Sequence, residues 1–191
     1  MSGILTRMPP AHRDQLKIYR LDLVWDDDGN NPYETLSPEE SSFGFDIARK
    51  REDARRWLQN PIRGAWCGVG LPIADYSSAA IAGDVLSQRA VGALRDVLDL
   101  QRGELYPMEV RGSKALYWIY RIWEPINVLG MPIPKVLVDQ VKNPVFLPNV
   151  VPPAIFKSMH EVRRWVTQNF VDRVEEAGLT GFDFQYVGGT G

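Results

Sequence analysis

The sequence predicts an α+β protein: a mixed, largely antiparallel sheet with several packed helices in a single domain. Three observations lead to this prediction. Short runs of alternating apolar and polar residues recur along the chain, as in strands that are buried on one face. Two amphipathic segments each start at a residue favoured at helix N-caps, Ser87 and Thr167. Seven of the 14 prolines lie between Pro125 and Pro153, which favours short strands and loops over helix there.

The length of 191 residues fits one domain. We expect residues 1–14 to form a flexible N-terminal segment, because Pro9 and Pro10 interrupt regular structure. Residues 15–187 then form the α+β domain. The glycine-rich residues 188–191 are expected to be a flexible tail.

The first predicted strand runs from Lys17 to Trp25. Its alternation predicts one buried face and one solvated face. The expected inner residues are Tyr19, Leu21, Leu23 and Trp25, and the expected outer residues are Arg20 and Asp22. The polar run 26–32 that follows predicts a turn.

A helix is predicted from Asp46, as its N-cap, to about Leu58, where a following proline ends it. Residues 61–80 are rich in Gly, Pro and Ser, so we expect a loop with room for one short strand. The glycine-rich run 64–70 is interpreted as loop throughout, because it matches neither the phosphate loop nor the dinucleotide fingerprint.

The second half of the chain predicts two helices between short strands. Ser87 begins one helix, Thr167 begins the other, and Gly178 ends the second. The interval 160–166 is open between helix and strand. The predicted strands cover 81–86, 105–110, 116–123, 135–141, 154–157 and the alternating end of the chain from Phe182. The side chains expected to be buried against the sheet are Leu94, Val97, Val171, Val174, Phe182 and Phe184.

A faint internal repeat links the two helices. Residues 85–88 read Val-Leu-Ser-Gln and residues 165–168 read Trp-Val-Thr-Gln, so Thr167 lies 80 residues after Ser87. Each helix is followed by a glycine and a strand. The pattern suggests two cap–helix–turn–strand units packed on one sheet. The alternative is coincidence, because capped amphipathic helices are common.

Composition narrows the classes of function. Lys and Arg number 22 and Asp and Glu number 24, which gives a formal charge of −2 and no bulk attraction to nucleic acid or membrane. The single cysteine, Cys67, excludes an intrachain disulfide and a cysteine-based metal site, and two histidines exclude a three-histidine site. The sequence shows no signal-peptide pattern and no apolar run of membrane-spanning length. We expect a soluble cytoplasmic protein that is not an enzyme and needs no cofactor or metal. Its oligomeric state is left open.

An acidic turn is the candidate partner-binding site. Asp26, Asp27 and Asp28 stand in a row, with Trp25 and Tyr33 on either side as possible anchors. Three carboxylates suit a basic partner surface. The alternative is a solvated turn that follows an edge strand. A calcium-binding EF-hand is excluded, because alignment on the glycine of the turn puts Val and Thr at the first and last ligand positions.

Two alternative hypotheses about function depend on other residues. His160 with a distant carboxylate is the candidate centre of a small hydrolase, although no Gly-x-Ser-x-Gly motif occurs. The basic cluster from Arg49 to Arg56 is the candidate for a nucleic-acid or regulatory module. Acidic residues interrupt this cluster, and Glu52 is placed to pair with Arg55 or Arg56 along a helix.

The order of motifs between residues 78 and 187 resembles a known bacterial family. Val85-Leu86-Ser87 opens a helix, Ile155-Phe156 lies in a strand, and the segment ends Gly178-Leu-Thr-Gly-x-x-Phe184. The family was first catalogued as a domain of unknown function, and its members were later assigned as immunity proteins of polymorphic-toxin systems. The resemblance implies a cytoplasmic α+β protein that binds and neutralises a cognate toxin, often encoded next to it. It carries over no catalytic residue and does not extend to residues 1–77.

The sequence therefore favours a non-enzymatic, immunity-type binding protein. Each reading predicts a different surface. A deep polar pocket at His160 would favour the hydrolase, and a continuous basic face with Arg49, Lys50 and Arg56 would favour the nucleic-acid module. An acidic and aromatic face without a pocket would favour the inhibitor.

Overall fold

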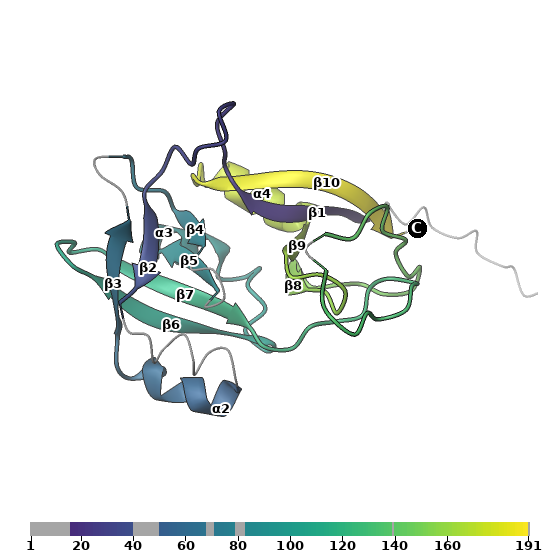
Figure 1. The fold of residues 1–191 in the computed structure, drawn as a ribbon, viewed down its shortest axis with the longest axis horizontal. Helices are drawn as coiled ribbons and strands as arrows, with labels where there is room; N and C mark the ends of the chain where they lie inside the picture. Colours follow the sequence, from purple (N-terminus) through teal and green to yellow (C-terminus); the bar gives the residue numbers. More distant parts are fainter. Residues whose placement is uncertain (1–15, 40–49, 68–70, 79–82, 139, 191) are drawn as a thin grey trace, which may run out of the picture.

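The computed structural model describes residues 16–39, 50–67, 71–78, 83–138 and 140–190, and it has the predicted α+β fold (Figure 1). The strands divide into two sheets. The smaller has the order β10-β1-β9-β8: Phe182–Thr190, Leu16–Leu23, Arg164–Thr167 and Ile155–Lys157. The larger has the order β2-β3-β6-β7-β5-β4: Thr35–Pro38, Ile62–Cys67, Gly103–Val110, Leu116–Ile122, Asp84–Ser87 and Tyr76–Ser78. Neighbouring strands are antiparallel except β3 and β6, which are parallel.

The two predicted helix starts are confirmed. Ser87 caps α3 (Gln88–Leu94), since its Oγ accepts a hydrogen bond from the Ala90 amide at 3.0 Å. Thr167 is the N-cap of α4 (Gln168–Glu176) by its extended backbone, although its side chain makes no capping bond. Gly178 follows α4 with a φ of 57°, the left-handed conformation that glycine adopts readily after a helix.

The basic cluster lies on a shorter helical element than expected. In place of one helix, the structure has the short helix α2 (Arg51–Ala54), followed directly by a single 3-10 turn, η1 (Arg55–Leu58). The expected cap, Asp46, lies outside the described residues. The two elements lie on the outer face of the six-stranded sheet, where Ala54 is buried and Trp57 packs against it.

The main core lies between the two sheets and includes α3 and α4. Of the six side chains expected there, Leu94, Val97, Val171 and Val174 are buried, whereas Phe182 and Phe184 are only partly buried at its margin. A second core lies beneath α2 and η1. A third fills the opposite face of the four-stranded sheet, where the proline-rich stretch contributes Val128, Leu129 and Val141.

The internal repeat has a structural counterpart, but the prediction that its two units pack on one sheet is wrong, because they lie in different sheets. The strand order β4-β5-β7-β6 in one sheet matches β8-β9-β1-β10 in the other. The registers of strand pairing agree as well. In the larger sheet Asp84 pairs with Tyr120, and Tyr120 pairs with Leu105. In the smaller sheet Arg164 pairs with Leu21, and Leu21 pairs with Phe184. The copies therefore share strand order, pairing and a helix after the second strand, and β1 from the start of the chain completes the second copy.

The equivalent ends of the two copies contact each other. Arg164 Nε lies 2.9 Å from Asp84 Oδ2, and these residues stand at the same position of β9 and β5. Asp75 accepts hydrogen bonds from Arg89 of α3 and from the Thr180 amide just after α4. Burial alone would raise the pKa of the Asp75 carboxyl, but these bonds and one from Ser87 outweigh it and lower that pKa.

Several local predictions are wrong, each for a physical reason. β1 is an interior strand covered on both faces, so Arg20, expected to be solvated, is 4% exposed. Part of the glycine-rich run belongs to β3, because Gly64 lets the Met108 side chain of β6 pack closely against its Cα. Residues 61–80 thus hold β3 and β4 rather than one short strand.

The remaining corrections concern the second half of the chain. The predicted strand 135–141 is irregular over its described residues, with one isolated bridge between Val138 and Glu161. The open interval 160–166 ends in a strand, β9. The predicted tail is part of β10 as far as Thr190, where Gly188 and Gly189 pair with β1. The predicted flexible segment 1–14 lies outside the described residues.

Candidate functional site

A buried ion pair anchors the proline-rich stretch on the four-stranded sheet. Arg20 Nε lies 2.9 Å from Glu161 Oε1, with both side chains almost fully buried. Glu161 also accepts hydrogen bonds from the Val141 amide and from Trp165 Nε1, each at 2.6 Å. Arg20 in turn donates to the Val141 carbonyl. Since every charge has several partners, the network fixes the backbone near Val141 against β1.

His160 is part of this anchor. Its side chain is 1% exposed, and its Nε2 lies 3.0 Å from the Met131 carbonyl oxygen. Its Nδ1 lies 3.4 Å from Ser158 Oγ, a hydroxyl that also accepts from the His160 amide. The adjacent carboxylate, Glu161, directs its oxygens to Arg20, Val141 and Trp165. A serine, a histidine and a carboxylate are thus close together, but their hydrogen bonds hold backbone and do not form a relay.

The anchored stretch presents an exposed apolar face. We define the apolar face by six residues: Met131, Ile133, Val136, Leu137, Val138 and Val162. Val136 is the most exposed, at 79%. Val138 and Val162 are joined by a backbone hydrogen bond of 3.0 Å. Five of the six lie between residues 131 and 138, so this segment exposes several apolar side chains close together in sequence, a feature typical of interaction sites.

A hollow of about 250 Å³ opens within the apolar face. Met131, Val138, Val141 and His160 line it together with Pro132 and Pro134, and Gln140 and Lys142 form its polar border. Lys135 and Lys142 are exposed on the same stretch. The hollow is therefore mostly apolar with a cationic border, and differs from the deep polar pocket that a hydrolase centred on His160 would need.

The acidic turn is exposed, and one of its carboxylates has a structural role. Asp26 Oδ1 accepts hydrogen bonds from the Asp28 amide at 3.1 Å and the Asn30 amide at 2.7 Å. Trp25 is 54% exposed, whereas Tyr33 is only partly exposed. The Asp27, Asp28 and Trp25 side chains are exposed, so these three residues of the turn are available to a partner.

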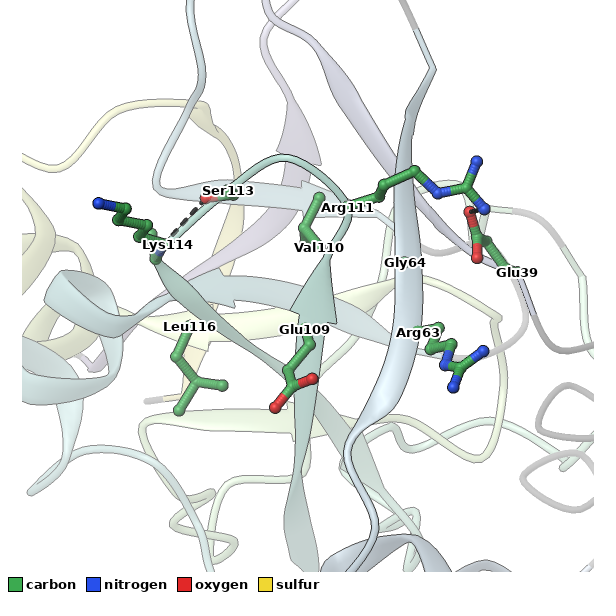
Figure 2. A pocket seen from close by; sticks show the side chains of 10 residues that line it. Glu39, Arg63, Gly64, Glu109, Val110, Arg111, Ser113, Lys114 and Leu116 are labelled. Carbon is green, nitrogen blue, oxygen red and sulfur yellow. Dashed lines mark hydrogen bonds and ion pairs between the residues drawn. The ribbon is translucent and has the colours of Figure 1, made fainter.

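A second hollow, of about 540 Å³, lies over the parallel strands β3 and β6 (Figure 2). Arg63 and Glu109 are cross-strand partners there, and Figure 2 shows Arg111 beside Glu39, with an ion pair of 2.9 Å. Ser113 Oγ accepts from the Ala115 amide and so supports the turn between β6 and β7. This groove is open and carries charges of both signs. It offers hydrogen-bonding groups to a polar surface.

The basic cluster is largely tied to the sheet beneath it. Arg51 forms ion pairs with Glu104 at 2.9 Å and Glu124 at 3.3 Å, and Arg55 approaches Glu104 at 3.7 Å. Arg51 and Arg55 thus share the Glu104 carboxylate of β6. Burial would raise the pKa of Glu104, but hydrogen bonds from Tyr106 and Arg51 lower it.

The described residues lack a metal-binding cluster and a membrane-spanning helix. No group of three or more His, Cys, Asp or Glu side chains among them is arranged to hold a metal ion. Among the same residues, no helix has the length and apolar character needed to cross a membrane.

Sequence comparison adds no family. No family model matches this chain, and no curated protein matches it either. The sequence does not predict the apolar face, since Val136, Leu137 and Val138 fall in a predicted strand and Val162 falls in an interval left open between helix and strand. The prolines between Pro125 and Pro153 were the available signal, because they prevent pairing and leave apolar side chains on irregular backbone.

Proposed function

We propose that this chain is a non-enzymatic, immunity-type protein that binds and neutralises a cognate bacterial protein toxin in the cytoplasm. The observation that carries the proposal is the apolar face, which a buried ion pair holds in place although it is open to solvent. A protein that only had to fold would gain by covering these side chains. The resemblance over residues 78–187 supplies the class of partner.

The rigidity of the apolar face supports a binding role. The backbone at Met131, Val138 and Val141 is held by His160 and by the Arg20–Glu161 network, so this part of the face needs little backbone ordering when a partner covers it. Lys142 at the border of the hollow favours a partner that presents apolar side chains with a carboxylate near them.

The structure supports the hydrolase and the nucleic-acid module less well. His160 is enclosed and bonded to backbone, which gives a hydrolase mechanism no exposed base. Within the described part of the basic cluster, Arg51 and Arg55 are engaged by Glu104, which weakens a continuous basic face for nucleic acid.

The proposal is tested with the protein encoded by the neighbouring gene, made as an inactive variant and purified with this chain. We expect a stable complex, and we expect co-expression of this chain to rescue cells from the active toxin. Val136→Asp should weaken the complex by at least about tenfold, because it places an unpaired charge in an apolar contact.

The matched control is Ile73→Asp. Ile73 is 51% exposed and forms an isolated bridge with Glu34, outside the strands of both sheets, so the substitution has similar chemistry away from the apolar face. It should leave affinity unchanged. Absence of any complex with the neighbouring gene product, together with failure to rescue, would overturn the proposed function.

A further inference from the structure

The open edges of the two sheets differ in length. β2, β4 and β8 are edge strands of 4, 3 and 3 residues, whereas the edge strand β10 has 9. Soluble proteins keep their sheet edges short or block them with proline or charge, because a long open edge invites pairing with another chain. Among the described strands β10 pairs with β1 alone, and no described strand pairs with its other side (Figure 1).

The donors on the open side of β10 can be assigned. The Phe184 amide donates to its neighbour's carboxylate, Asp183 Oδ1, at 2.9 Å, and so points away from β1. Amide directions alternate along a strand, so the Tyr186 amide also faces outward while the Gln185 amide faces β1. The Tyr186 side chain is 59% exposed. Two backbone donors and their carbonyls are thus presented to a partner.

The internal repeat shows how a strand can pair with this edge. β10 is the counterpart of β6, and β6 has a neighbour on that side: β3 pairs with Met108, Glu109 and Val110 in the parallel direction. Earlier along β6 stands Pro107, which has no amide hydrogen to donate. The position of Pro107 opposite Trp118 corresponds to Tyr186 opposite Tyr19. β10 therefore lacks both the covering strand and the blocking proline of its counterpart.

The open edge continues into the apolar face. Gln185 of β10 is hydrogen-bonded to Gln140 of the proline-rich stretch, with Nε2 and Oε1 3.1 Å apart. A partner that covers the apolar face would extend past Gln140 onto β10. Backbone pairing would add affinity and fix the direction of the bound segment, while the apolar face would select its side chains.

We propose that an extended strand of the neutralised toxin pairs with the open edge of β10, running parallel to it as β3 runs beside β6. This inference rests on the proposed function and names the way in which the partner is held. The bound strand displaces the Asp183 carboxylate from the Phe184 amide and takes its place as acceptor.

The test transfers the blocking device of β6 to β10. Tyr186→Pro removes one outward donor without removing a bond to β1, and the fold already carries a proline at the equivalent position of β6. The matched control, Tyr186→Ala, removes the same ring but keeps the amide. Both purified variants are compared with the wild type by thermal unfolding and by affinity for the neighbouring gene product. Tyr186→Pro should weaken binding by about tenfold or more relative to Tyr186→Ala.

Hydrogen exchange of the wild-type chain gives a second measurement that needs no variant. The Phe184 and Tyr186 amides should exchange more slowly in the complex than in the free protein. If the complex forms but these amides stay unprotected and the two variants bind equally, the strand-pairing inference is overturned and the proposed function stands. If no complex forms, the proposed function fails, and this inference fails with it.

Discussion

The four-stranded and six-stranded sheets repeat one arrangement on their shared inner faces, but their outer faces are covered in different ways. α2 and η1 cover the larger sheet, and their Arg51–Glu104 ion pair is partly exposed. The proline-rich stretch covers the smaller sheet, and its Arg20–Glu161 ion pair is buried. The arrangement that the two sheets share therefore lies on their inner faces. The segments on their outer faces differ, and the proline-rich stretch on the smaller sheet forms the apolar face.

The largest expected effect is on stability, and it differs between the buried Arg20–Glu161 ion pair and the partly exposed Arg51–Glu104 ion pair. Glu161→Ala should lower the free energy of unfolding by about 3–5 kcal/mol, because it leaves Arg20 buried without its carboxylate and frees the Val141 and Trp165 donors. Glu104→Ala in the other half should cost only about 1 kcal/mol, since solvent reaches Arg51. Urea denaturation measures both variants. Equal losses would contradict the distinction between a buried and a partly exposed anchor.

The second prediction compares core positions of the two copies. Leu94 is fully buried on α3, so Leu94→Ala should cost about 3 kcal/mol through lost burial and a residual cavity. Phe184 lies at the margin of the same core, with its ring 6.4 Å from Phe170. Phe184→Ala should therefore cost about 1–2 kcal/mol, less than a fully buried phenylalanine. A larger loss for Phe184 than for Leu94 in denaturation midpoints would place the centre of the core on the β10 side.

The third prediction uses the like charges of the second copy. Lys157 and Arg164 pair directly across β8 and β9, and burial, followed by the charges of Arg121 and Arg164, lowers the pKa of Lys157 from 10.5 to about 8. Below pH 8 both folded and unfolded chains are protonated there, and the folded state carries the full penalty. Between pH 8 and 10.5 the folded state releases its proton first, so stability rises with pH.

Lys157→Met should therefore stabilise the protein at pH 7, by about 1 kcal/mol once screening by solvent is allowed for. The advantage should shrink between pH 8 and 10.5, because the wild-type lysine becomes neutral in the folded state. Unfolding curves at pH 7 and pH 10 measure this change. An advantage that is the same at both pH values would mean that packing, and not the buried charge, is responsible.

Much of the fold follows from local sequence signals. Ser87, Thr167 and Gly178 define helix ends because their effects act within one turn. The repeat was visible for the same reason. By contrast, the alternation of apolar and polar residues predicts a solvated Arg20. This pattern cannot show that Glu161, far along the chain, supplies a buried partner. The apolar face and the open edge of β10 depend on which segments pair, and such long-range contacts leave no periodic pattern in the sequence.

The smallest expected effect concerns the acidic turn and appears in kinetics rather than in stability. Asp26 holds the turn through the Asp28 and Asn30 amides, so the informative change is Asp27→Asn combined with Asp28→Asn. If the turn contacts a basic region of the partner, association should slow severalfold at low salt, and the difference should vanish at high salt because exposed charges are screened. Stability should be unchanged, since both side chains are exposed. Stopped-flow association with the neighbouring gene product at two salt concentrations measures the effect. Identical rates at low salt in the folded double variant would leave Asp26 with its structural role and remove the turn from the interface.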